Sequence, residues 1–176
     1  MAFSSALYAR VKEYLDSDGL HYDEFPDEGR FQFGINIHSK VRNVTVRIFV
    51  DEDNFSVVSF PQFGGDPQDP ENMHALAEYT ARANYGLVQG NFQIDFRDGE
   101  LRYWSAMLTD DNNLPSIHTI GRVVFVGIMM WERYGDGYLK VGLAGVDPET
   151  AVNEAENPQP AAPQEPSPTT IDPEIL

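Results

Sequence analysis

The fold is decided by residues 86–108, GLVQGNFQIDFRDGELRYWSAML. Asp98-Gly99 is a two-residue turn of the kind that joins antiparallel strands, and pairing outward from it places Ile94 opposite Tyr103. One face then collects five apolar side chains: Phe92, Ile94, Phe96, Leu101 and Tyr103. The other face opposes two sets of charges, Asp95 with Arg102 and Arg97 with Glu100. A slip by one residue would reverse every face, so this register of a β-hairpin is predicted.

Apolar spacing outside this hairpin predicts further helices and strands. Long helices are expected over residues 5–18, 70–84 and 116–134, and strands over residues 31–38, 43–50 and 55–60. Gly135-Asp136-Gly137 should end the third helix, and residues 138–144 fit a short helix better than an edge strand. The order α-β-β-β-α-β-β-α predicts an α+β fold: a five-stranded, mostly antiparallel, twisted sheet with helices packed on one face.

The third long helix is apolar nearly all round. Val126, Met129 and Met130 add to its regular apolar stripe, which predicts that it is the most buried helix. Gly121 and Gly127 each weaken a helix by about 1 kcal/mol relative to Ala. We expect both glycines to allow a close approach of this helix to the sheet.

The composition is that of an acidic, cysteine-free chain with a sizeable core. Of its 176 residues 41% are hydrophobic, and the net charge is −16. Nucleic acid and anionic membrane surfaces select basic patches and are therefore poor partners. Residues 1–15 lack the pattern of a secretory signal, and the longest apolar run, Val123–Trp131, is too short to span a membrane. We therefore expect a cytoplasmic protein that binds neither nucleic acid nor membrane.

A change in composition divides the chain near residue 146. Residues 147–176 contain seven acidic residues, seven of the twelve prolines, and neither Lys nor Arg. Such a segment buries too little to offset its ordering entropy. We predict one α+β domain over residues 1–146 and a disordered, acidic, Pro-rich tail over residues 147–176. Ile171, Ile175 and Leu176 could anchor the tail on a partner or on the domain itself, whereas a plain solubilising tail is the simpler interpretation.

The sequence contains no recognisable constellation for catalysis or metal binding. The four histidines, His21, His38, His74 and His118, form no metal-ligand motif. A calcium loop starting at Asp51 would need Gly where Ser56 stands and Glu where Gln62 stands. No nucleophile elbow, phosphate-binding loop or dinucleotide fingerprint is present. We predict no catalytic residues, no cofactor, no metal and no enzymatic activity.

Large aromatic side chains on a polar sheet face indicate a protein-binding patch. Trp104 shares its face with Gln93 and Arg102, and Phe49 shares a face with Arg47. The predicted protein-binding residues are Phe49, Phe60, Phe63 and Trp104, with Trp131 as a further candidate for the rim. Helix 5–18, the loop 61–68 or the tail could instead cover them.

Three segments of the organising region resemble the central signature of the YbjN-like domain family. They are Asn84-Tyr85-Gly86-Leu87, residues 89–95 (QGNFQID) and residues 98–103 (DGELRY). The resemblance covers about residues 3–145 and implies a fold like that of type III secretion chaperones, often dimeric. The family is described as regulators of sensory transduction in bacteria, without established catalytic residues. The glycines of the third helix and the Pro-rich tail depart from the usual domain.

Three functions remain open on the sequence. The first is a non-enzymatic regulatory or chaperone-like domain that takes a protein segment on its sheet face or in a helix-lined groove. The second is a structural homodimer that uses the open sheet face as its interface. The third is a small-ligand sensor or enzyme with a pocket near the 61–68 loop.

Overall fold

An antiparallel sheet forms the centre of the computed structural model, which describes residues 2–110 and 113–158. Its six strands lie in the order β1-β2-β3-β4-β6-β5, and every neighbouring pair is antiparallel. The strands are β1 (Asp23–Phe25), β2 (Arg30–Asn36), β3 (Asn43–Val50), β4 (Asn54–Pro61), β5 (Asn91–Ile94) and β6 (Leu101–Leu108). The strand absent from the prediction is β1, whose three residues are too few to show an alternating pattern.

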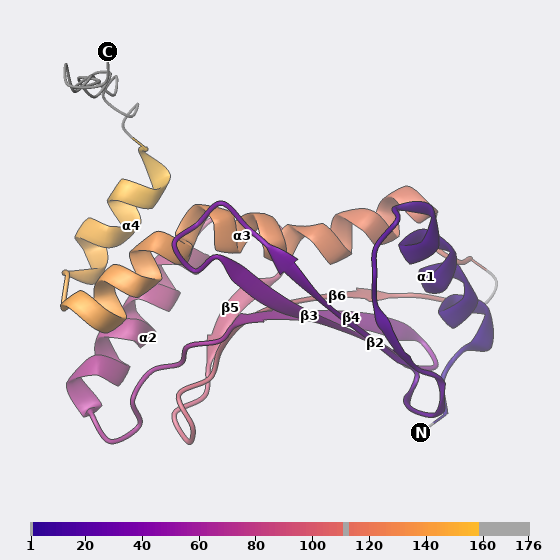
Figure 1. The fold of residues 1–176 in the computed structure, drawn as a ribbon, viewed down its shortest axis with the longest axis horizontal. Helices are drawn as coiled ribbons and strands as arrows, with labels where there is room; N and C mark the ends of the chain where they lie inside the picture. The colour runs from indigo at the N-terminus through magenta and orange to yellow at the C-terminus, as the bar shows by residue number, and fades with distance from the viewer. Residues whose placement is uncertain (1, 111–112, 159–176) are drawn as a thin grey trace, which may run out of the picture.

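Four α-helices accompany the sheet, together with a short 3₁₀ helix, η1 (Pro26–Glu28). They are α1 (Ser5–Ser17), α2 (Pro70–Asn84), α3 (Ile117–Ala144) and α4 (Pro148–Glu156). Figure 1 shows α3 extended along one side of the sheet, with α1 at one end of the molecule and α2 and α4 at the other. The predicted α+β class with helices on one face of an antiparallel sheet is therefore confirmed.

Polar side chains cap the N-termini of the helices at the positions where the sequence predicts helix starts. The Ser4 hydroxyl accepts a hydrogen bond from the Leu7 amide at 3.2 Å and caps α1. The Asp69 carboxylate accepts from the first-turn amides of α2, just before Pro70. The Ser116 hydroxyl caps α3 in the same way. Each cap satisfies a backbone N–H that the helix itself leaves unpaired.

Aromatic rings form the centre of the core between α3 and the sheet. Trp131 is fully buried, and its ring meets the Phe92 ring edge-on at 5.1 Å and the Tyr138 ring at 5.6 Å. Its Nε1 donates to the Ser59 carbonyl at 2.9 Å. Trp131 is therefore a core residue, and the prediction that it rims a binding patch is wrong.

The helix α3 is longer than predicted, because Gly135 and Gly137 do not end it. It continues to Ala144 and ends at Gly145, which has a φ of +64°. A Cβ at Gly135 would lie 2.5 Å from the Ser39 hydroxyl, and one at Gly137 would collide with the Tyr79 hydroxyl. These glycines let α3 approach the 39–41 turn and α2 closely, at a propensity cost of about 1 kcal/mol each.

The two glycines expected to face the sheet have different neighbours. A Cβ at Gly127 would collide with the Ser59 hydroxyl on β4, as the prediction requires. A Cβ at Gly121 would lie 2.9 Å from the ring of Tyr14, which belongs to α1. The close approach at Gly121 is therefore between two helices.

The predicted register of the β5–β6 hairpin is wrong by two residues. Ile94 pairs with Leu101, and Phe92 pairs with Tyr103. Asp98-Gly99 lies inside a longer connection, in which the Gly99 amide donates to the Asp95 carbonyl at 2.8 Å. The Gly99 carbonyl also accepts from the Gly65 amide at 2.8 Å, so this loop is held by the loop after β4. A shift of two residues preserves both faces, as the side-chain period requires, while Phe96 leaves the strand and is exposed.

The first part of the predicted tail is folded. Residues 148–156 form α4, which Asp147 caps through its carboxylate to the Thr150 amide at 2.9 Å. Ala151 and Val152 are buried against α2 and α3. Disorder from residue 147 is therefore wrong for α4, because its apolar residues were too few to stand out in a Pro- and Glu-rich segment. The remainder of the predicted tail, residues 159–176, lies outside the described residues.

Candidate functional site

The face of the sheet away from α3, called the open face below, displays alternate side chains of β2 to β6. A row across its centre places Arg47, Val58 and Trp104 side by side on β3, β4 and β6. On the same face, Phe49 follows Arg47 by two residues along β3, on one side of this row. Phe60 follows Val58 by two residues along β4, on the other side of the row. Trp104 is 37% exposed, because α1, a predicted cover, packs with α3 on the opposite side.

The charged residues at open-face positions of β2 to β6 are all arginines: Arg30, Arg47 and Arg102. The Arg47 Nε donates to Gln32 Oε1 at 2.8 Å, and its guanidinium carbon lies 4.7 Å from the Phe60 ring centre. No carboxylate of the described residues forms an ion pair with Arg47. Neutral and aromatic partners therefore orient this cation without neutralising it, in a protein whose net charge is −16.

The two flanking arginines are partly neutralised. The Arg30 Nε lies 2.8 Å from the Glu28 carboxylate, and the Arg30 guanidinium stacks over the Phe25 ring at 3.7 Å. Arg102 donates to Gln93 at 3.0 Å and lies 3.6 Å from the Glu100 carboxylate. Arg47 is therefore the strongest cationic site on the open face.

Three of the four predicted protein-binding residues come together on this surface. Phe49, Phe60 and Trp104 all project from the open face around Arg47. Phe63 does not join them, since it lies in the loop after β4. Its side chain is 57% exposed, and its carbonyl accepts from the Tyr138 hydroxyl of α3 at 2.6 Å. Phe49, Phe60 and Trp104 lie within strands, where alternating side chains point to the same face. Phe63 lies beyond Pro61, the last residue of β4, so this alternation does not determine its direction.

The two outermost strands, β5 and β1, are each protected against pairing with a further strand. On the outer side of β5, the Asn84 side chain acts like a neighbouring strand. Its Oδ1 accepts from the Phe92 amide at 2.7 Å and its Nδ2 donates to the Phe92 carbonyl at 2.9 Å. At the other edge β1 has only three residues, and two of them, Asp23 and Glu24, are acidic. Acidic residues on a short strand discourage strand addition. This protection covers only the part of β2 that β1 pairs with, residues 30–32.

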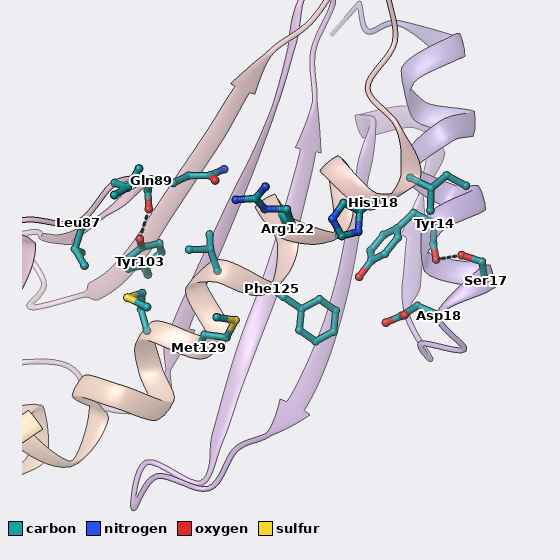
Figure 2. A pocket seen from close by; sticks show the side chains of 15 residues that line it. Tyr14, Ser17, Asp18, Leu87, Gln89, Tyr103, His118, Arg122, Phe125 and Met129 are labelled. Carbon is teal, nitrogen blue, oxygen red and sulfur yellow. Dashed lines mark hydrogen bonds between the residues drawn. The ribbon is translucent and has the colours of Figure 1, made fainter. Parts of the chain in front are cut away.

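A second surface lies on the helical side of the molecule. It is a groove of about 800 Å³ between α1, the first half of α3 and the turn after α2, and is called the groove below. In Figure 2, Phe125 and Met129 of α3 lie between Tyr14 of α1 on one side and Leu87 on the other. Arg122 and His118 are the basic side chains of its lining, and Met129 is 55% exposed.

The groove explains why α3 is apolar nearly all round without being buried all round. The apolar residues beyond its core stripe, including Phe125, Val126, Met129 and Met130, line this groove. The prediction that these extra apolar residues make α3 more deeply buried does not hold for them. An amphipathic helix needs only one apolar stripe, so the extra residues indicated a second apolar surface, the groove.

Metal ligands and titratable groups decide what chemistry these surfaces can carry. Among residues 2–110 and 113–158 no group of three or more histidines and carboxylates could hold a metal ion. Burial raises the pKa of Tyr103, beneath the groove, to about 12, and its hydroxyl donates to the Gln89 carbonyl. A tyrosine held protonated by burial stabilises the fold but supplies no base near neutral pH.

Comparison with known proteins adds distant structural similarity. No family model and no curated protein match the chain. A chain of the HopA1–SchA chaperone–effector complex is 14% identical, with a TM-score of 0.47, covering 73% of this chain and 93% of that one. A chain of the ExsC–ExsE complex has the same identity and TM-score, covering 76% of this chain and 96% of that one. Similarity this distant transfers nothing from those complexes, and membership of the YbjN-like family stays a prediction.

Within the part of the chain that the structure describes, every helix is too short or too polar to cross a lipid bilayer.

Proposed function

We propose that the protein is a non-enzymatic regulatory or chaperone-like module that holds a segment of another protein on its open face. The partner segment carries apolar side chains spaced by carboxylates. The observation that carries this proposal is Arg47, an un-neutralised guanidinium against the Phe60 ring, in the same row of the sheet face as the exposed Trp104. Aromatic residues and arginine are the side chains that concentrate binding energy at protein interfaces.

Charge argues against a homodimer through the open face. A two-fold interface places the same patch of both copies against itself. Arg47 of one copy, whose described partners are Gln32 and Phe60 rather than a carboxylate, would then meet Arg47 of the other. Like charges at an interface core are unfavourable, so an acidic partner segment fits this surface better than a second copy does.

The test is a selection of displayed peptides on the full chain, followed by affinity measurements. Selected peptides should combine apolar residues with Asp or Glu. They should bind Arg47→Glu at least about tenfold more weakly, a loss of about 1.4 kcal/mol. The matched control is Lys40→Glu, which makes the same charge change at an exposed residue between β2 and β3. Selected peptides that bind all three proteins equally would refute the open face as the docking site.

A further inference from the structure

The groove and a second, polar crevice lie on one stripe of α3. The polar crevice is lined by α3, α4 and the 38–39 turn, and it includes Pro158, the last described residue. From the groove to the crevice the lining residues on α3 include His118, Arg122, Phe125, Met129, Arg133, Asp136 and Lys140. Steps of three and four residues follow one face of an α-helix. A chain leaving Pro158 along this stripe therefore reaches the groove.

We propose that residues 171–176, Ile-Asp-Pro-Glu-Ile-Leu, dock in the groove of their own chain. This inference is independent of the open face. The docked segment covers an apolar surface that the described residues leave open, Met129 above all.

The length of the connecting chain is sufficient. Twelve residues lie between Pro158 and Ile171, four of them prolines at 160, 163, 166 and 168, so thirteen residue steps connect the two. In a polyproline-like conformation they span about 40 Å, at about 3.1 Å per residue. From Asp136 in the crevice to Arg122 in the groove is fourteen residues of α3, or about 21 Å at 1.5 Å per residue.

The chemistry of the segment complements the groove. Ile171, Ile175 and Leu176 supply apolar side chains for a lining that includes Phe125 and Met129. Asp172 and Glu174 supply carboxylates for a rim that carries Arg122. Arg122 forms no ion pair with any described residue, although acidic residues exceed basic ones 28 to 12 in the chain.

The geometry also separates the two surfaces. The segment leaves α4 on the helical side of the sheet, beside the polar crevice. Reaching the open face would require passing around an edge of the sheet. The tail is therefore assigned to the groove, and the open face is left to a partner.

Engineered cysteines test this assignment cleanly, because the chain has no cysteine of its own. The full chain is given the pair Met129→Cys and Ile175→Cys, and the control is the pair Leu108→Cys and Ile175→Cys. Leu108 is a matched apolar residue, 82% exposed, on the opposite face of the sheet. Docking raises the local concentration of the thiols, so the groove pair should form a disulfide within one chain about tenfold faster than the control pair.

Each other outcome overturns the proposal. Equal rates for the two pairs would show an unattached tail. A disulfide between two chains, growing with protein concentration, would assign the groove to a second copy. A second measurement avoids new cysteines: the methyl signals of Met129 and Met130 in the NMR spectrum of the full chain should shift with Ile175→Asp and stay unchanged with Thr169→Asp. Signals unmoved by Ile175→Asp would also refute docking.

Discussion

The two tryptophans of the chain lie on opposite faces of the same sheet. Trp131 is 0% exposed, contacts the rings of Phe92 and Tyr138 edge-on, and donates its N–H to the Ser59 carbonyl. Trp104 is 37% exposed between Val58 and Asn91, in a row that also contains Arg47. The first has its partners within the fold, whereas the second has a surface open to a partner outside it. The comparison separates aromatic residues that stabilise the protein from those available for binding.

The largest expected effect is on stability, from a substitution in the core between α3 and the sheet. Trp131→Ala should lower the free energy of unfolding by about 3–5 kcal/mol, because it opens a cavity and unpairs a buried carbonyl. Trp104→Ala should lower it by less than about 1 kcal/mol, since this side chain is partly exposed already. Urea unfolding of both variants measures the difference. Equal losses would show that the open face is covered in solution.

Alkaline pH should lower the stability of the protein through two buried tyrosines, Tyr103 and Tyr138. Burial raises the pKa of both Tyr103 and Tyr138 to about 12, whereas an unfolded tyrosine titrates near 10. Above about pH 10 the unfolded chain releases protons that the folded chain retains, so stability falls as the pH rises toward about 12. Below pH 10 this contribution is fully present. Urea unfolding across this range should show the fall, and Tyr138→Phe should make it shallower; a flat profile would contradict the assignment.

The next effect concerns Asn84, whose side chain caps the outer edge of β5. Asn84→Ala should cost about 1–3 kcal/mol, because it leaves the amide and the carbonyl of Phe92 without their partner. It should also promote self-association through the freed edge of β5. Asn43→Ala is the matched control, since its side chain bonds the exposed Asn36. Unfolding and light scattering of the two variants give the comparison; identical behaviour would remove Asn84 from its role as an edge cap.

The smallest effect comes from a pair of buried serines. Among residues 2–110 and 113–158 the Ser59 hydroxyl finds no hydrogen-bond partner, and Gly127 faces it closely. Ser59→Ala should therefore change stability by less than about 0.5 kcal/mol, or raise it. The Ser105 hydroxyl, equally buried, donates to the Val123 carbonyl at 3.0 Å, so Ser105→Ala should cost about 1–2 kcal/mol. Equal costs measured by urea unfolding would show that Ser59 is bonded in solution.

The faces of the strands were predictable from the sequence, whereas the register of β5 with β6 and the end of α3 were not. Alternation placed Phe49 and Trp104 correctly on the open face. It could not distinguish the register at Asp98-Gly99 from one shifted by two residues, because both keep the same faces. The hydrogen bond that holds the observed loop, from the Gly65 amide to the Gly99 carbonyl, joins residues distant in the sequence.

The same limit applies to the helices and the groove. The predicted helix starts at residues 5, 70 and 116 agree with α1, α2 and α3 to within one residue, because the caps that start them act over only a few residues. Gly135 and Gly137 were misread as an end, because their neighbours Ser39 and Tyr79 come from other elements. The groove was missed for the same reason, since one wall belongs to α1 and another to the turn after α2.

The uninterrupted course of α3 has a consequence for how the molecule comes apart. This helix contacts α1, α2, α4 and three strands, and it crosses between the two ends of the fold (Figure 1). No plane therefore divides the described residues into halves that keep separate cores. Detaching α1 or α4 exposes only part of α3, whereas detaching α3 exposes the core residues of the sheet and of the other helices together. The protein is accordingly one cooperative unit with two ends that can fray, and its sheet persists only as long as its longest helix does.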